Sequence, residues 1–139
     1  MYAADRFGAQ PGWVGGHKVY ALWDAYVHAD FVTYPSLIEG FGNALLETFY
    51  YGLPALVNRY PVYAADIAPL GFDVVEIDAH DDPANLAAIT DDILASVVEV
   101  MLDPVRRQRM VEWNYELARQ HFSFEAVTSF ILKRAREVS

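Results

Sequence analysis

Residues 31–57 read FVTYPSLIEGFGNALLETFYYGLPALV, and this stretch decides the fold. Phe31 to Tyr34 is a β-branched and aromatic run that ends at a proline, which predicts a short strand. A loop with two glycines follows, and Asn43 to Tyr51 predicts a helix that Gly52 closes from just beyond its end. Ala55 to Val57 predicts a second strand. Strand, helix and strand in this order indicate an α/β fold with a parallel sheet.

The residues before this stretch divide into two parts. Met1 to Gly16 carries several glycines and a proline without a period, which predicts a loop. Lys18 to Ala29 places apolar residues three and four apart, which predicts a helix.

The residues after it give one more strand and then helices. A polar connection with prolines, Asn58 to Gly71, precedes a third strand at Asp73 to Ile77. The pairs Asp82-Pro83 and Asp103-Pro104 are helix start signals, and Ser123 opens a last helix. The first of these helices is expected to line one face with Leu86, Ile89, Ile93, Val97 and Val100 or Met101, and the last with Val127, Phe130, Ile131 and Ala135.

The chain is therefore expected to be one α/β domain over residues 1–139. It comprises a loop-like lead-in at 1–17, an α/β core at 18–78 and a helical part at 79–139. The core is expected to hold a partial Rossmann-like parallel sheet of about three strands, followed by C-terminal helices.

Composition limits the classes of function. The chain has 139 residues, of which 54% are hydrophobic, and its formal net charge is −9, so it is too apolar for a disordered chain and lacks the basic patch of a nucleic-acid partner. It has no cysteine, which excludes disulfides and thiolate metal sites and fits a cytoplasmic protein. No transmembrane segment or secretory signal is expected, and no His, Asp and Glu set has metal-site spacing.

The loop between the first predicted strand and its helix is where a ligand is expected. In open α/β sheets, ligands bind at the carboxyl ends of strands, and a helix N-terminus there suits phosphate. Gly40 and Gly42 would let the backbone approach a ligand closely. Glu39 precedes the helix and Glu47 lies about one turn inside it, and such carboxylates can accept hydrogen bonds from the hydroxyls of a ribose or a sugar.

Simpler interpretations exist for each of these residues. Glu47 could be a solvent-facing helix residue, and Glu39 a loop residue that favours the helix dipole. Gly40 and Gly42 could be turn glycines alone.

This stretch resembles the family 4 retaining glycosyltransferases, which have the two-Rossmann GT-B fold. Glu39 and Glu47 enclose seven residues that begin Gly-Phe-Gly, which is the family signature, and the resemblance extends from about Val19 to Asp78. It includes the flanking segments Ala29-Asp30-Phe31-Val32, Pro35-Ser36 and Tyr51-Gly52-Leu53-Pro54. The chain would then be part of the C-terminal, donor-binding domain.

The resemblance also implies roles for individual residues. Glu39 would be catalytic, orienting the donor sugar and helping to stabilise charge at the anomeric centre. Backbone amides would face the sugar at Gly40, Phe41 and Gly42 and the diphosphate at Asn43, Ala44 and Leu45, while Glu47 would bind the ribose. No tightly bound cofactor and no metal ion are implied.

The implied reaction is transfer of a hexosyl group from a nucleotide sugar to a small hydroxyl acceptor, with retention. Phe49 to Gly71, with Asn58-Arg59-Tyr60-Pro61-Val62-Tyr63 inside it, resembles a subgroup that makes mannosyl or glucosyl derivatives of small compatible solutes. GDP-mannose is therefore the favoured donor, and UDP- or GDP-glucose are the alternatives.

Several parts of the family pattern are absent from the sequence. The acceptor domain with its His is missing, as is the half of the donor domain that supplies an Arg and a Lys; Lys18 and Arg59 are the cations nearest the motif in sequence. The chain is therefore expected to be a fragment that is inactive alone. A partial sheet leaves an unpaired edge, so a homo-oligomer or association with the missing N-terminal portion is expected. The alternative function is a non-catalytic nucleotide-binding or self-associating module.

Overall fold

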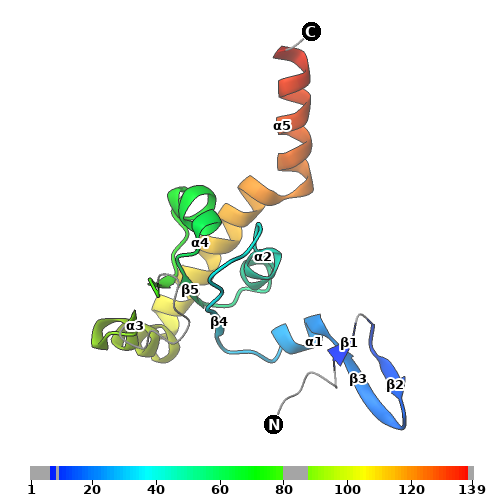
Figure 1. The fold of residues 1–139 in the computed structure, drawn as a ribbon, viewed down its shortest axis with the longest axis vertical. Coiled ribbons are helices and arrows are strands. Elements are labelled where there is room, and N and C mark those ends of the chain that lie inside the picture. Colours follow the sequence, from blue (N-terminus) through cyan, green and yellow to red (C-terminus); the bar gives the residue numbers. More distant parts are fainter. Residues whose placement is uncertain (1–6, 9, 80–87, 138–139) are drawn as a thin grey trace. The chain divides into compact units, whose positions relative to one another are not determined.

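Figure 1 shows the computed structural model, which describes residues 7–8, 10–79 and 88–137. The chain forms two compact units, Met1–Asp30 and Phe31–Ser139. They are described separately.

The first unit contains a small three-stranded sheet and a short helix. Strand β3 (His17–Ala21) pairs parallel with β1 (Phe7–Gly8) and antiparallel with β2 (Gly12–Val14), and helix α1 (Leu22–Tyr26) follows directly. The Asp24 carboxylate accepts a hydrogen bond of 2.8 Å from the Ala21 N–H, which satisfies a free donor at the start of the helix.

This unit corrects two predictions. Residues 1–16 are not wholly loop, because β1 and β2 lie there, and residues 18–29 are not one helix, because β3 occupies the first part. Gly15 and Gly16 both have positive φ angles, +57° and +79°, as a two-residue hairpin turn requires. Residues 17–21 therefore pair with β2 as a hairpin strand, although the spacing of their apolar side chains also fits a helix.

The second unit contains the predicted parallel sheet. Its strands are β4 (Val32–Tyr34), β5 (Ala55–Asn58) and β6 (Val75–Ile77), in the order β4-β5-β6, with Val32 opposite Ala55 and Leu56 opposite Val75. Helix α2 (Asn43–Tyr50) connects β4 to β5. The α/β fold with a partial Rossmann-like sheet is thus confirmed.

The connection from β5 to β6 is more regular than the sequence predicts. It contains a π-helical turn, η2 (Tyr63–Ile67), and a 3-10 turn, η3 (Ala68–Leu70). Both turns pack on the sheet and α2, and the shared core consists of Leu45, Phe49, Ala55, Val57, Tyr60, Tyr63, Ile67 and Phe72.

Helix α2 buries the face that the sequence predicts. Leu45 and Phe49 are fully buried and Leu46 is partly buried, whereas Glu47 is exposed. Thr48 is also fully buried, and its hydroxyl donates a hydrogen bond of 2.8 Å to the Ala44 carbonyl. This local bond lets a polar side chain lie in the core.

Three helices follow: α3 (Asp91–Leu102), α4 (Pro104–Phe122) and α5 (Phe124–Glu137). The predicted starts of α4 and α5 are confirmed. Asp103 accepts bonds from the N–H groups of Val105 and Arg106, and Ser123 accepts one from Ala126. These side chains satisfy amides that a helix start otherwise leaves free.

Helix α3 differs from the prediction. The Asp82-Pro83 start and Leu86 lie outside the described residues. Thr90 caps α3 by accepting a bond of 3.3 Å from the Ile93 N–H, so Ile89 precedes the helix instead of lining its face. The prediction of one continuous helix that starts at Asp82-Pro83 and carries both Ile89 and Ile93 on one face is therefore wrong.

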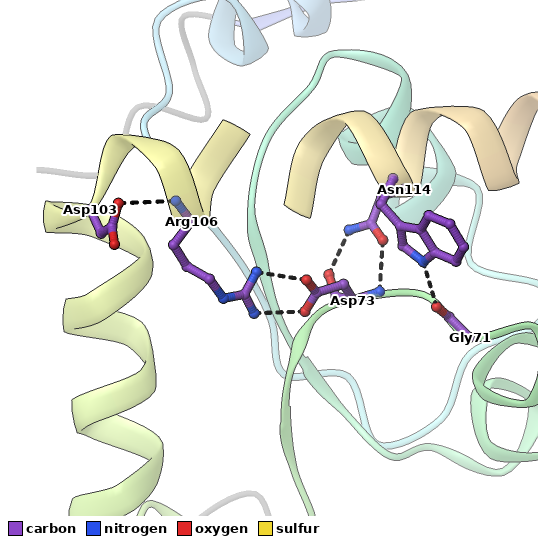
Figure 2. Close-up of polar contacts among 6 residues, drawn as sticks. Gly71, Asp73, Asp103, Arg106 and Asn114 are labelled. Carbon is purple, nitrogen blue, oxygen red and sulfur yellow. Dashed lines mark hydrogen bonds and ion pairs between the residues drawn. The ribbon is translucent and has the colours of Figure 1, made fainter. Parts of the chain in front are cut away.

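A polar cluster fastens α4 to the chain just before β6 (Figure 2). The Arg106 guanidinium donates two bonds to the Asp73 carboxylate, at 2.6 and 2.8 Å. The fully buried Asn114 side chain accepts from the Asp73 N–H and donates to the Asp73 carbonyl, at 2.7 and 2.6 Å. Trp113 donates to the Gly71 carbonyl. These contacts hold α4 against the sheet beside α2.

Candidate functional site

The candidate site lies where β4 ends and α2 begins. Residues 35–42 connect these two elements at the carboxyl edge of a parallel sheet, which is the ligand-binding edge of open α/β folds. The sequence predicts the site at this place, and the structure adds the contacts that shape it.

Asn58 ties three strand ends together at this edge. It is the last residue of β5 and is 1% exposed. Its amide donates a bond of 3.1 Å to the Ser36 carbonyl after β4 and accepts one of 2.9 Å from the Ala79 N–H after β6. Sequence reasoning did not assign Asn58 this role; its signal is a polar residue at the end of an otherwise apolar strand.

Gly42 shapes the start of α2. It is the N-cap residue with a φ of +84°, in the left-handed region that favours glycine. A Cβ at this position would also collide with the Tyr60 hydroxyl. The Gly42 carbonyl accepts a bond of 2.9 Å from the Leu45 N–H. Helix geometry leaves the Asn43 and Ala44 N–H groups without intrahelical acceptors, so they can bind an anion.

Gly40 differs from Gly42. It is exposed, and a Cβ built there would have no atom within 4 Å. Packing within the free protein therefore does not require glycine at this position.

Glu39 and Phe41 belong to the same loop and have different surroundings. The Glu39 side chain is partly buried, and one of its carboxylate oxygens accepts a bond of 3.3 Å from the Ser36 hydroxyl. The Phe41 ring meets the Phe122 ring edge-on, with centroids 5.2 Å apart. Phe122 stacks in turn on Phe72, and Phe72 on Phe49. This aromatic column connects the loop to the core.

Glu47 lies on the exposed face of α2 and borders a separate cavity. The cavity has a volume of about 340 Å³, and Glu39 does not line it. Its walls come from α2 and α4 together with the residue that follows α4: Leu46, Glu47, Tyr50, Tyr115, Ala118, Arg119, Phe122 and Ser123. A predominantly apolar cavity beside one carboxylate has the character of a small-molecule pocket.

Tyr60 is a further group at the site, and sequence reasoning did not single it out. The residue is 1% exposed, and its hydroxyl has no hydrogen-bond partner among the described residues. Burial raises the pKa of the phenol, and the charge of Glu39 raises this pKa further. The phenol therefore stays protonated at neutral pH. Its hydroxyl lies beside Gly42 and has no acceptor among the described residues.

The described part of the chain holds neither a metal-ligand cluster nor a membrane-spanning helix. No group of three His, Asp or Glu side chains could hold a metal ion there. None of the helices in residues 7–8, 10–79 and 88–137 is long and apolar enough to cross a membrane.

No family model matches the chain. Two curated proteins with the same name, mannosylglucosylglycerate synthase, are similar to it. The chain is 55% identical to the Petrotoga mobilis protein over 60 residues, which are 43% of the chain and 14% of that protein. It is 36% identical to the Thermotoga maritima protein over 122 residues, which are 84% of the chain and 28% of that protein.

The relatives of this chain are glycosyltransferases. The chain spans less than a third of the length of either relative. The similarity therefore relates the chain to sugar transfer in general.

Proposed function

We propose that this chain forms part of the nucleotide-sugar site of a retaining, GT-B glycosyltransferase of family 4. The observation that carries the proposal is the open N-terminus of α2 at the carboxyl edge of the sheet, with Glu39 before it and Glu47 one turn inside it. The chain's similarity to two mannosylglucosylglycerate synthases supports the same class of reaction.

Each proposed role follows from the chemistry of the group. The Asn43 and Ala44 N–H groups and the positive end of the α2 dipole stabilise the diphosphate as it leaves, which is an electrostatic task. The backbone of Gly40, Phe41 and Gly42 faces the sugar, and Glu39 orients its hydroxyls and stabilises positive charge at the anomeric carbon. The resemblance also assigns the Leu45 N–H to the diphosphate, although this N–H already donates to the Gly42 carbonyl.

The proposed role of Glu47 is to accept hydrogen bonds from the ribose. Its carboxylate borders the α2–α4 cavity, where a nucleoside could be partly enclosed. Carboxylates accept from both hydroxyls of a diol without needing to donate in return.

The proposed donor is GDP-mannose, with UDP- or GDP-glucose as alternatives, and the proposed acceptor is a small hydroxyl compound. The names of both relatives include a mannosyl group, which supports the mannosyl donor. Because the chain matches 28% of the T. maritima relative, we propose that transfer also needs the portion of such an enzyme that this chain does not match.

An NMR titration of the labelled chain tests the donor site. GDP, UDP, ADP and their hexose conjugates are added separately, and saturable shifts at residues 39–47 with one nucleotide are expected. Glu47→Ala should abolish them, because the ribose loses its acceptor. Glu112→Ala, which removes an exposed carboxylate on α4, is the matched control and should bind as the wild type does. Absence of shifts from a folded sample would contradict the proposal.

The second candidate is a non-catalytic, self-associating module, which one observation favours: β4 is the terminal strand of its sheet in the described part of the chain. The two candidates differ in one measurement. Hexosyl transfer that appears when the unmatched portion of a relative is added as a separate polypeptide supports the enzyme, and its absence despite complex formation supports the module.

A further inference from the structure

The Tyr60 hydroxyl is a buried donor that lacks a partner among the described residues. Native proteins pair nearly all such groups, because an unpaired buried donor has lost its bonds to water without replacement. An unpaired group of this kind beside a candidate site therefore suggests a partner that arrives with the ligand.

Packing fixes where this hydroxyl can point. The Tyr60 ring lies between the rings of Tyr34 and Tyr63, with centroid distances of 6.0 and 5.7 Å. Its hydroxyl end lies against Gly42, the N-cap residue of α2. Because the ring is buried between two others and its hydroxyl lies beside Gly42, we expect a new partner for the hydroxyl to come from the loop that ends at Gly42.

Glu39 is the carboxylate of the loop that lies between β4 and α2. It precedes Gly42 by three residues and accepts a bond of 3.3 Å from the Ser36 hydroxyl, which is long for an O–H···O bond. The charge of Glu39 also raises the pKa of the Tyr60 phenol, after the larger effect of burial. A bond from a phenol to a carboxylate would be stronger than the present one from Ser36.

We propose that Tyr60 is a positioning residue, whose hydroxyl donates a hydrogen bond to the Glu39 carboxylate when a nucleotide sugar is bound. The bond holds Glu39 against the sugar, and it satisfies a donor that has no partner among residues 7–8, 10–79 and 88–137. This inference rests on the proposed function. It requires that Tyr60 affects recognition of the sugar and not of the diphosphate.

Two tyrosine variants test this inference by NMR titration with GDP-mannose and with GDP. Tyr60→Phe keeps the ring and should lower the affinity for GDP-mannose about tenfold, as expected for a lost bond to a charged group, while the affinity for GDP stays the same. Tyr63→Phe is the matched control. Tyr63 is fully buried in the same segment, but its hydroxyl already donates to Glu76 at 2.6 Å, so both affinities should remain unchanged.

Thermal unfolding of the free variants separates positioning from a structural role. Tyr60→Phe removes an unpaired hydroxyl, so its unfolding midpoint should equal or exceed that of the wild type. Tyr63→Phe breaks a bond and should lower the midpoint by about 3–8 °C. A Tyr60→Phe variant that loses both stability and sugar affinity would contradict the inference.

Glu39→Gln completes the test. If Tyr60 acts through Glu39, the double variant should lose no more GDP-mannose affinity than Glu39→Gln alone. Equal binding of GDP-mannose by Tyr60→Phe and the wild type overturns the inference alone, as does an equal loss for GDP and GDP-mannose. No binding of either ligand by the wild type overturns the proposed function and the inference together.

Discussion

Gly42 meets two separate demands at the residue scale. Its backbone has a positive φ, and its missing Cβ leaves room for the Tyr60 hydroxyl. Gly52 meets only the first demand, since a Cβ there would find open space. The pair therefore separates the energetic effect of the backbone conformation from that of close contact.

Gly42→Ala should destabilise the chain more than Gly52→Ala. The backbone conformation alone should cost about 1 kcal/mol at Gly52, and the collision with Tyr60 should raise the cost at Gly42 to about 2–4 kcal/mol. Urea unfolding curves of the two variants measure the difference. Equal costs would show that Tyr60 adapts without strain.

The buried tyrosines predict how stability depends on alkaline pH. Burial is the main cause that raises the pKa of both Tyr60 and Tyr63, and at Tyr63 a hydrogen bond to Glu76 contributes as well. The folded state therefore favours the neutral phenols. Their contribution to stability is complete below the unfolded-state pKa of about 10 and decreases as the pH rises above it.

The free energy of unfolding should accordingly fall as the pH rises above about 10, and replacement of both tyrosines by Phe should flatten this decline. Urea unfolding at several pH values provides the measurement. Tyr50→Phe, at an exposed position, is the control and should leave the slope of the wild type. An unchanged slope in the Tyr60 and Tyr63 double variant would contradict the prediction.

The sequence predicted an element correctly where a side chain close in sequence sets its boundary. The Asp103 and Ser123 caps, and the burial of Leu45 and Phe49 in α2, follow from short-range chemistry. The hairpin of β2 and β3 was missed because apolar spacing over residues 18–29 fits a helix, and only strand pairing settles the choice. Helix α3 was placed too early because Asp82-Pro83 and Thr90 are both adequate start signals.

The attachment of α4 depends on Asn114. Its side-chain amide forms hydrogen bonds with both the backbone N–H and the backbone carbonyl of Asp73, as a neighbouring strand would. Asn114→Ala removes these partners from the partly buried N–H and carbonyl of Asp73, so a loss of about 1–3 kcal/mol of stability is expected. Chemical denaturation measures this loss. Gln108→Ala, on the exposed face of the same helix, should change stability by less than about 0.5 kcal/mol.

For the whole molecule, the sheet order leaves β4 with one strand neighbour in the described part of the chain. The Val32 N–H donates to the Pro54 carbonyl, so the backbone groups of Val32 face β5. Successive residues of a strand alternate in direction, and the backbone N–H and carbonyl of Thr33 therefore face away from β5. Unpaired edges favour association with another chain, and this feature supports the predicted oligomer.

The chain should therefore self-associate at high concentration, and Thr33→Pro should weaken this association. Proline removes an outward donor without touching the bonds to β5. Analytical ultracentrifugation across a concentration series measures the effect, and circular dichroism checks that the fold remains. A wild-type chain that stays monomeric at millimolar concentration would contradict the prediction.

The position of the candidate site could be predicted from the sequence, because a strand, a glycine loop and a helix start are consecutive in the chain. Its supporting contacts could not. Asn58 contacts the loop from the end of β5, and Tyr60 contacts it from the core. A polar residue at a strand end is a signal for Asn58, but the neighbouring sequence does not show which residues either side chain contacts. The cavity beside Glu47 depends on how α4 docks, and that docking depends on Asn114 and Arg106.

The aromatic column has a consequence for motion. Because Phe41 contacts Phe122 at the end of α4, and Phe122 contacts Phe72 in the core, we expect opening of the loop to break a contact with the end of α4. Opening of the loop and release of the helix end are thus coupled as one local unfolding event. A ligand that holds residues 39–45 in place should also slow hydrogen exchange at the last turns of α4, which line the cavity beside Glu47.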